Sequence, residues 1–313
     1  MKEIRFFIKN ILLCSLPFVM FNVIIALLLI VTSNTDDLTY VSYASSLDKR
    51  SRLDSLSNQK RIVIIGGSNA RFAFQSGLIK EELGIEPVNM GLHIALGLNY
   101  MLEEVEHKLK SEDILLISPE YQHFISNDIY GGTSDLTDMY LVQKNWGKAF
   151  EHMIETKNFV SFYKLLRKRY KRRKINTDSI PETMEVRTKY NFYGDYVGHY
   201  KLPAQKLQRC DVSSKPNSKI VADVAKRINI LKEAGVKVYI LPPPFSETAY
   251  KRDLKNIEAI QTALQRAGIG FAVPPIQSVY PDSMFYDTEY HLNKKGGTQH
   301  TLKMAYIISH QLR

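Results

Sequence analysis

The sequence predicts an α/β fold, with a parallel sheet covered by helices on both faces, preceded by a membrane-spanning helix. Short runs rich in β-branched residues alternate with helical patterns, and turn residues end most of these runs, which is typical of βαβ units. A separate apolar run of bilayer length near the amino terminus indicates the membrane helix. The 313 residues suffice for one large α/β domain with an additional segment.

The apolar run 11–32 contains no charged residue and has the length that a bilayer-spanning helix needs. Lys2, Arg5 and Lys9 precede it and two aspartates follow it, which predicts a cytoplasmic amino terminus and an extracytoplasmic remainder. We therefore expect residues 1–32 to form a cytoplasmic tip and a transmembrane helix, with the lipid bilayer as a partner. A cleaved signal peptide is the alternative, although its apolar region is usually shorter and VTSNTDD is a poor cleavage site.

The alternation of strands and helices begins after a polar stretch, residues 33–59, which we expect to be a juxtamembrane linker. The α/β domain is expected to cover residues 60–313. Its expected strands are 61–65, 87–90, 113–118, 236–241 and 269–273, and its expected helices are 72–83, 98–109, 220–234, 246–267 and 296–311. Residues 121–217 interrupt the alternation, so we predict a partly helical insertion that lies over the strand ends as a lid or partner surface.

The formal net charge of +10 comes in part from one basic run, Leu165–Lys174. This run is either a solvated helix face or a contact for anionic lipid headgroups or an acidic glycan. The sequence has no zinc-like Cys/His spacing, RRM signature or helix-turn-helix pattern, so we expect no nucleic-acid partner. Cys14 and Cys210 indicate no disulfide framework, and we expect neither a cofactor nor a metal.

The turn Gly66-Gly67-Ser68-Asn69 directly follows the first expected strand and precedes a helix. Glycines permit a tight turn there, which places Ser68 at the carboxyl edge of the sheet, where ligands bind in open α/β folds. Backbone N–H groups at such a position can stabilise an oxyanion, which suits a nucleophile. The alternative interpretation is a glycine-rich turn in which Ser68 caps the helix.

A histidine near the carboxyl terminus could serve as the base for such a serine. Residues 285–293 read FYDTEYHLN and lie just before the last helix. A serine hydroxyl needs a base to accept its proton, and an acid must hold that base in one tautomer. The loop around His291 contains both kinds of residue, so Ser68 and His291 together form the candidate site.

Three short motifs in this order resemble the SGNH/GDSL hydrolase superfamily. They are GGSN after the first strand, NMGL after the second, and YHLN followed by two residues and a glycine before the last helix. The resemblance covers residues 60–120 and 218–313 and implies a flavodoxin-like sheet. With a membrane anchor ahead of the domain, the chain is similar to a membrane-anchored branch, which includes the teichoic-acid D-alanyl-transfer protein and the SGNH domains of polysaccharide O-acetyltransferases.

The resemblance implies roles for three residues of this sequence. The family's nucleophile falls on Ser68, whose backbone N–H would also stabilise the oxyanion. A second oxyanion donor of the family, a glycine, falls on Gly91 in NMGL, and the family's histidine falls on His291.

The acid of the site departs from the family's spacing. The usual acid lies three residues before the histidine, where this chain has Thr288. We expect Asp287 to replace it, because a loop can absorb one extra residue. Glu289 and Glu120 remain candidates for the acid or for a contact with the substrate.

A further departure concerns the family's third oxyanion donor, an asparagine, which has no clear counterpart after the third strand. Ser118-Pro119-Glu120-Tyr121 stands there instead. The resemblance implies a serine esterase or O-acyltransferase in the bacterial cell envelope, which acts on acyl esters of an envelope glycan and could work with a membrane-bound acyl-transfer partner. The alternative is a catalytically inactive scaffold or binding protein in an envelope polysaccharide assembly. A phosphate-binding turn for a nucleotide or flavin is a weaker interpretation, since it leaves His291 unexplained.

Overall fold

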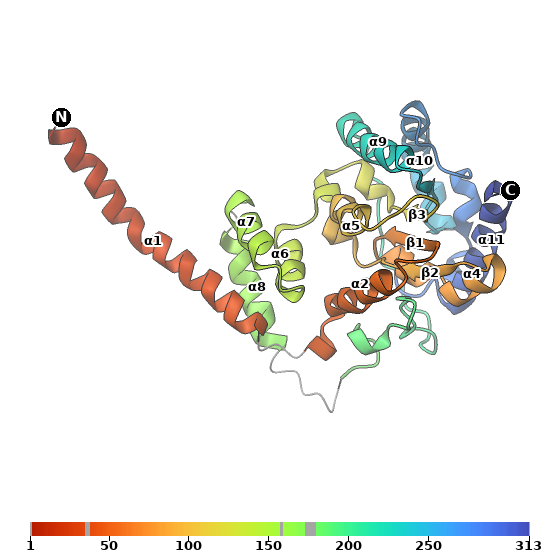
Figure 1. Cartoon of the computed structure of the whole chain (residues 1–313), viewed down its shortest axis with the longest axis horizontal. Helices are drawn as coiled ribbons and strands as arrows, with labels where there is room; N and C mark the ends of the chain where they lie inside the picture. The colour runs from red at the N-terminus through yellow and green to blue at the C-terminus, as the bar shows by residue number, and fades with distance from the viewer. Residues whose placement is uncertain (1, 35–37, 157–158, 173–179, 313) are drawn as a thin grey trace. The chain divides into compact units, whose positions relative to one another are not determined.

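The computed structural model describes residues 2–34, 38–156, 159–172 and 180–312. The chain divides into two compact units, which are described separately (Figure 1). Residues 39–132 and 182–313 form the first, which we call the sheet unit. Residues 1–38 and 133–181 form the second, which we call the anchor unit.

Four parallel strands form the sheet of the sheet unit, in the order β2-β1-β3-β4 (Figure 1). Their bounds are β1 (Arg61–Gly66), β2 (Glu86–Asn89), β3 (Ile114–Ser118) and β4 (Lys237–Ile240). Every residue of β1 and β3 is buried. Strands that are buried on both faces have no polar side to show, which is why these two are nearly continuous apolar runs. The predicted α/β class with a parallel sheet is confirmed.

Helices cover both faces of this sheet. The main helices of the unit are α2 (Ser45–Ser55), α3 (Ser68–Ala73), α4 (Ser76–Leu83), α5 (Gly97–Glu106), α9 (Ser218–Glu233), α10 (Glu247–Arg266) and α11 (Lys294–Leu312). Ile62 and Ile64 of β1 pack in one apolar cluster with α3, α4 and α11. Alternate side chains of a strand point to opposite faces, so α5 and α9, which contact β1 and β4 outside this cluster, cover the other face.

Two expected elements differ from the structure. The run 269–273 is not a strand, although the Ala272 N–H donates to the Ile240 carbonyl of β4 at 2.7 Å. Two prolines follow the run directly, and proline lacks the N–H that would continue a ladder. Residues Phe245–Ser246 (β5) and Val279–Tyr280 (β6) pair instead as a small parallel sheet. The helix expected over 72–83 is two helices, α3 and α4, of which the first begins at Ser68.

The stretch 33–59, expected to be a linker, contains helix α2, which belongs to the sheet unit. Lys49 and Arg52 of α2 are buried. The Arg52 guanidinium donates to the Pro87 carbonyl at 3.1 Å and pairs with Glu86 at 2.8 Å. Helix α2 is therefore fastened to strand β2 through polar groups, which an apolar periodicity does not reveal.

The expected insertion 121–217 divides between the two units. Its helices α6 (Thr133–Val142), α7 (Trp146–Thr156) and α8 (Phe159–Arg172) belong to the anchor unit. Residues 182–217 belong to the sheet unit, where the buried Asp195 carboxylate accepts hydrogen bonds from Ser76 at 2.6 Å and Asn89 at 2.9 Å. This second part is thus bound to the carboxyl end of β2.

The anchor unit contains α1 (Lys2–Asn34), which by length and composition could cross a membrane. Its most apolar window has a mean hydropathy of 2.6, and most of its side chains are exposed, unlike those of a buried core helix. The carboxyl-terminal part of α1 is covered, because Ile25 and Leu29 pack against Leu141, Ala149 and Leu165 of the three shorter helices.

Candidate active site

Ser68 is the first residue of α3 and follows β1 across Gly66 and Gly67. Its side chain is buried, and its hydroxyl donates to Glu120 Oε1 at 3.3 Å. A Cβ on Gly67 would lie 2.7 Å from that same oxygen, and a Cβ on Gly66 would overlap the Ser118 carbonyl. Gly66 is therefore required by the close approach of β3, and Gly67 leaves room for the Glu120 carboxyl group.

Glu120 follows β3 and lies against the serine. Glu120 is 2% exposed, and its Oε1 also accepts from the Asn69 N–H at 3.1 Å. Among the residues that the structure describes, Oε2 has no hydrogen-bond partner. Burial raises the pKa of Glu120 above its ordinary value, although the Asn69 N–H, the charge of His291 and the Ser68 hydroxyl act in the other direction. Glu120 therefore holds a proton more readily than an exposed glutamate does.

His291 and Asp287 form a pair on the loop before α11. His291 Nδ1 lies 2.7 Å from Asp287 Oδ1. A carboxylate only accepts, so Nδ1 carries the proton and Nε2 is left as an acceptor. The imidazole also stacks on Phe72, with ring centroids 4.0 Å apart and an angle of 6° between the planes. Thr288 stabilises the loop, because its Oγ1 accepts from the His291 N–H at 3.1 Å.

Ser68 and His291 lie on the same side of α3. Phe72 comes four residues after Ser68, which puts both on one face of the helix, and the imidazole stacks on Phe72. Within the described residues, the Ser68 hydroxyl bonds to Glu120 and not to the imidazole. A catalytic hydrogen bond is often long or absent without a substrate and forms only in the complex.

Glu289, the second candidate acid, points away from the imidazole. Its carboxylate pairs with Arg252 at 2.6 Å and accepts from the Cys210 N–H at 2.7 Å. These contacts fasten the 182–217 segment and α10 to the loop of the histidine. Cys210 and Cys14 are both free thiols. Of the three candidate carboxylates, Asp287 alone contacts His291, Glu120 contacts Ser68, and Glu289 has a structural position.

Gly91, expected to be an oxyanion donor, has its N–H engaged by Asn89 Oδ1 at 3.0 Å. A Cβ there would lie 2.8 Å from the Ala70 Cβ and 2.9 Å from the Arg71 nitrogen. In this structure Gly91 allows its loop to approach α3, and its N–H is not available to an oxyanion. The side-chain acceptor two residues earlier in NMGL is the physical reason.

Three residues around the site were missed by the sequence interpretation. Arg71, on α3, is buried and pairs with Glu185 at 2.6 Å. Burial alone would raise the pKa of Glu185, but the charges of Arg71 and His291 outweigh it and lower that pKa. The ring centroid of His199 lies 4.6 Å from that of Phe72, and its Nε2 lies 3.1 Å from the Leu292 carbonyl oxygen. Burial and the neighbouring His291 lower the pKa of His199 to about 4, so His199 supports the loop as a neutral ring.

The signals for these three residues differ. Arg71 lies three positions after Ser68, so the helical spacing could have identified it. Glu185 and His199 lie in the segment 121–217, whose path the sequence pattern does not determine.

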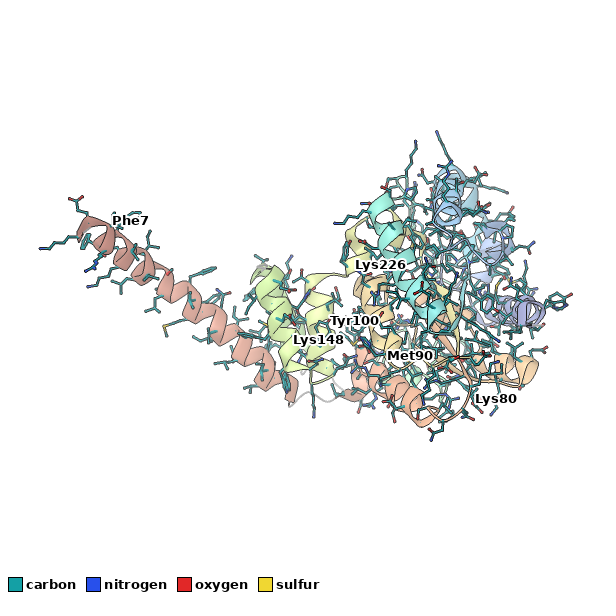
Figure 2. All side chains as sticks on the ribbon, turned by 45° about the horizontal axis from the view of Figure 1, so that its top comes forward. Phe7, Lys80, Met90, Tyr100, Lys148 and Lys226 are labelled. Carbon is teal, nitrogen blue, oxygen red and sulfur yellow. The ribbon has the colours of Figure 1, made fainter. Side chains whose placement is uncertain are left out.

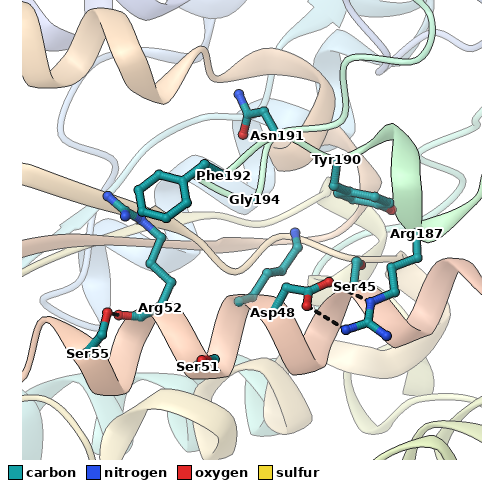
Figure 3. Close-up of a pocket in the computed structure, with 11 residues that line it drawn as sticks. Ser45, Asp48, Ser51, Arg52, Ser55, Arg187, Tyr190, Asn191, Phe192 and Gly194 are labelled. Atoms are coloured by element: carbon teal, nitrogen blue, oxygen red, sulfur yellow. Dashed lines mark hydrogen bonds and ion pairs between the residues drawn. The ribbon is translucent and has the colours of Figure 1, made fainter. Parts of the chain in front are cut away.

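A cavity of about 390 Å³ lies between α2 and residues 187–194 (Figure 3). It is lined by Ser45, Asp48, Lys49, Ser51, Arg52, Ser55, Arg187, Tyr190, Asn191, Phe192 and Gly194. Asp48 pairs with Arg187 at 2.6 Å, and the Arg52 guanidinium lies 4.1 Å from the Phe192 ring centroid (Figure 3). The cavity does not include the serine or the histidine. Lys49, one of its lining residues, donates from its ammonium to the Gly91 carbonyl.

The described residues contain no group of three or more histidine, cysteine, aspartate or glutamate side chains that could hold a metal ion. No protein-family model matches the chain, and a search of curated proteins finds no match.

Proposed function

We propose that the chain is a membrane-anchored serine esterase or O-acyltransferase of the SGNH type, with acyl esters of a cell-envelope glycan as its substrates. The observation that carries this proposal is the 2.7 Å contact between Asp287 and His291, on the side of α3 that presents the buried Ser68. These are the residue types of a nucleophile, base and acid. The strand order β2-β1-β3-β4 fits the flavodoxin-like order 2-1-3-4-5. The choice of a glycan rests on the family resemblance.

In the proposed reaction, the Ser68 hydroxyl turns from Glu120 to His291 Nε2 and attacks the ester carbonyl carbon. The imidazole takes the hydroxyl proton, and Asp287 stabilises the imidazolium. The proton then passes to the leaving alcohol as the ester bond breaks, which leaves an acyl group on Ser68. Water or a sugar hydroxyl attacks this acyl group, with His291 again as the base, and the two acceptors define the esterase and the transferase.

The oxyanion of the tetrahedral intermediate needs donors other than Gly91, whose N–H is engaged. We assign the Ser68 N–H and a protonated Glu120 to this role. A carboxylic acid combines an acceptor oxygen with an O–H donor, as a side-chain amide combines an acceptor oxygen with N–H donors. Oε1 of Glu120 accepts two hydrogen bonds, and Oε2 is buried with no partner among the described residues, so a proton on Oε2 would be the donor. Glu120 would thereby replace the family's asparagine.

The test uses the full chain in nanodiscs, a small chromogenic acetyl ester and a fluorophosphonate probe. Ser68→Ala and His291→Ala should each lower kcat by about 10⁴-fold or more, since the loss of one triad member removes most of the catalysis. Ser283→Ala, which removes an exposed hydroxyl near the histidine loop, is the matched control and should retain activity and labelling. Labelling that persists in Ser68→Ala would contradict the assignment of the nucleophile.

One observation favours the inactive scaffold as a second candidate. The Ser68 hydroxyl is directed at Glu120 and not at the imidazole. A scaffold would fold normally, would not react with the fluorophosphonate at any pH and would not hydrolyse the ester. Reaction of Ser68 with the probe, at a rate that depends on His291, would exclude it.

A further inference from the structure

The covered and uncovered parts of α1 divide its length in a way that suits a bilayer. Side chains of α1 up to Ile24 are largely exposed, and the first buried ones are Ile25, Ala26 and Leu29. From Ile8 to Ile24 the helix extends about 25 Å at its usual rise per residue, close to the thickness of the hydrocarbon core. Lys9 lies one residue inside this stretch, near enough to its end for the ammonium to reach the headgroups. Figure 2 shows the side chain of Phe7 near the beginning of this uncovered part.

The three short helices pack where the uncovered part ends. Ile25 and Leu29 contact Leu141 of α6, Ala149 of α7 and Leu165 of α8. If the uncovered length occupies the hydrocarbon, α6, α7 and α8 lie at the depth of the lipid headgroups next to the carboxyl end of α1.

The exposed side chains of α7 and α8 suit that depth. Phe150 and Ile154 of α7 are 52% and 59% exposed, and Val160 and Tyr163 of α8 are 64% and 57% exposed. Exposed aromatic and aliphatic side chains beside basic ones are typical of helices that lie in the membrane interface.

The basic side chains of α8 form a concave surface. A depression of about 430 Å³ is lined by Lys164, Arg167, Lys168, Lys171 and Arg172. Arg169 and Arg172 also neutralise the buried Asp138, each at 2.8 Å, but Lys164, Arg167 and Lys171 point outward on exposed positions. Lys168 also lies 3.6 Å from the Asp138 carboxylate, so Lys164, Arg167 and Lys171 supply most of the uncompensated charge at this hollow. These three cations repel one another, and a bound anion relieves that repulsion. We call Lys164, Arg167, Lys168 and Lys171 the basic face.

We propose that the basic face of α8, together with the exposed apolar side chains of α7 and α8, binds anionic phospholipid headgroups in the leaflet at the carboxyl end of α1. The charge of the face selects an anion, and its attachment to the end of the anchor brings it to a lipid surface. The interaction orients the anchor unit on the membrane and does not depend on the reaction at Ser68.

The test uses a variant whose single tryptophan lies on α8, so that its fluorescence reports which lipid is near the basic face. The chain has one tryptophan, Trp146, so Trp146→Phe with Tyr163→Trp moves it one residue from Lys164. This full chain is reconstituted in phosphatidylcholine nanodiscs with one tenth phosphatidylglycerol, and bromine is attached either to the phosphatidylglycerol or to an equal amount of the phosphatidylcholine. We expect brominated phosphatidylglycerol to quench the fluorescence at least twofold more, and we expect added salt to reduce the difference.

Two variants in this background identify the cause. Gln at all four positions of the basic face should remove the preference. The matched control, Gln at the exposed Lys226, Lys232, Lys255 and Lys295 of the sheet unit, changes the net charge equally and should keep it. Circular dichroism verifies that both variants are folded. Equal quenching by the two brominated lipids, an unchanged preference in the first variant, or binding of a soluble acidic polysaccharide without a lipid preference would each overturn the proposal.

Discussion

The two sides of the candidate site are held in place by different means. We call them the nucleophile side and the base side, after the roles proposed for Ser68 and His291. On the nucleophile side, Ser68 and Glu120 follow two adjacent strands, and Gly66 lets β1 approach the Ser118 carbonyl of β3. On the base side, Asp287 and His291 lie on a loop that is supported by ring stacking and by the 182–217 segment. The nucleophile side is thus fixed by the sheet, whereas the base side depends on side chains from distant parts of the sequence. Removing a single side chain should therefore affect the two sides differently.

The largest effect is expected on the base side. Asp287→Asn should lower kcat by about 10⁴-fold, because an amide no longer holds His291 in the tautomer that accepts the serine proton. Ester hydrolysis by the full chain measures it. Glu289→Gln removes the neighbouring carboxylate, which contacts Arg252 and not the imidazole. This substitution should change kcat by less than about threefold from the wild-type value. The reverse order of the two effects would assign the acid to Glu289.

The next effect is on the nucleophile side. Glu120→Ala should lower kcat by about 10²–10³-fold, as the loss of an oxyanion donor does. Glu120→Gln keeps an acceptor oxygen and a donor group and should retain most of the activity. Because the donor is the protonated carboxyl, wild-type activity should fall as the pH rises through the raised pKa of Glu120, and Gln at this position should lack that fall. A glutamine variant as inactive as the alanine variant would show that the carboxylate itself is required.

A smaller effect is expected at the residue that joins the two sides. Phe72 lies on α3 with the nucleophile and stacks on His291. Phe72→Leu should lower kcat about tenfold through a misplaced imidazole, with a loss of about 1 kcal/mol in unfolding free energy. Phe74→Leu is the matched control, since Phe74 is buried and packs edge-on against His300. Its loss of stability should be similar, with kcat nearly unchanged. Equal losses of activity would mean that general destabilisation explains both.

The smallest effect is expected at Lys49, whose ammonium donates a hydrogen bond to the Gly91 carbonyl in the loop after β2. Burial, and then the charge of Arg71, lowers the pKa of Lys49 well below its ordinary 10.5. The unfolded chain therefore binds more protons between the lowered pKa and 10.5, so this lysine makes the protein more stable as the pH rises through that window. Lys49→Met should flatten this rise in thermal melting curves. A slope that Lys49→Met leaves unchanged would assign it to other groups.

The sequence predicted one part of each side of the candidate site. β1 is a continuous apolar run followed by two glycines, and such a run leaves little choice of structure. The pairing of Asp287 with His291 was expected from their spacing on one loop, and the structure places them 2.7 Å apart. The role of Gly91 as an oxyanion donor was not reproduced, because the Asn89 side chain takes its N–H. That detail depends on a rotamer, which a sequence motif does not specify.

The remaining differences have a common physical cause. The contact between Arg71 and Glu185 joins positions 114 residues apart, and α2 docks through Lys49 and Arg52. Long-range polar contacts follow no periodicity, so a local pattern of apolar residues cannot reveal them. The mean composition of 33–59 indicates a polar linker, although the cationic side chains in it find main-chain oxygens in the folded unit.

The docking of α2 has a practical consequence for any soluble form of the protein. A chain cut just before β1 would retain the whole sheet. The carbonyls of Pro87 and Gly91 would lose the hydrogen bonds that they accept from Arg52 and Lys49 of α2. The strand next to the nucleophile would then have one uncovered flank and an empty groove where α2 had been. A protease that separates this protein from its anchor without harming it must cut before Ser45, and secreted versions for crystallisation should begin there.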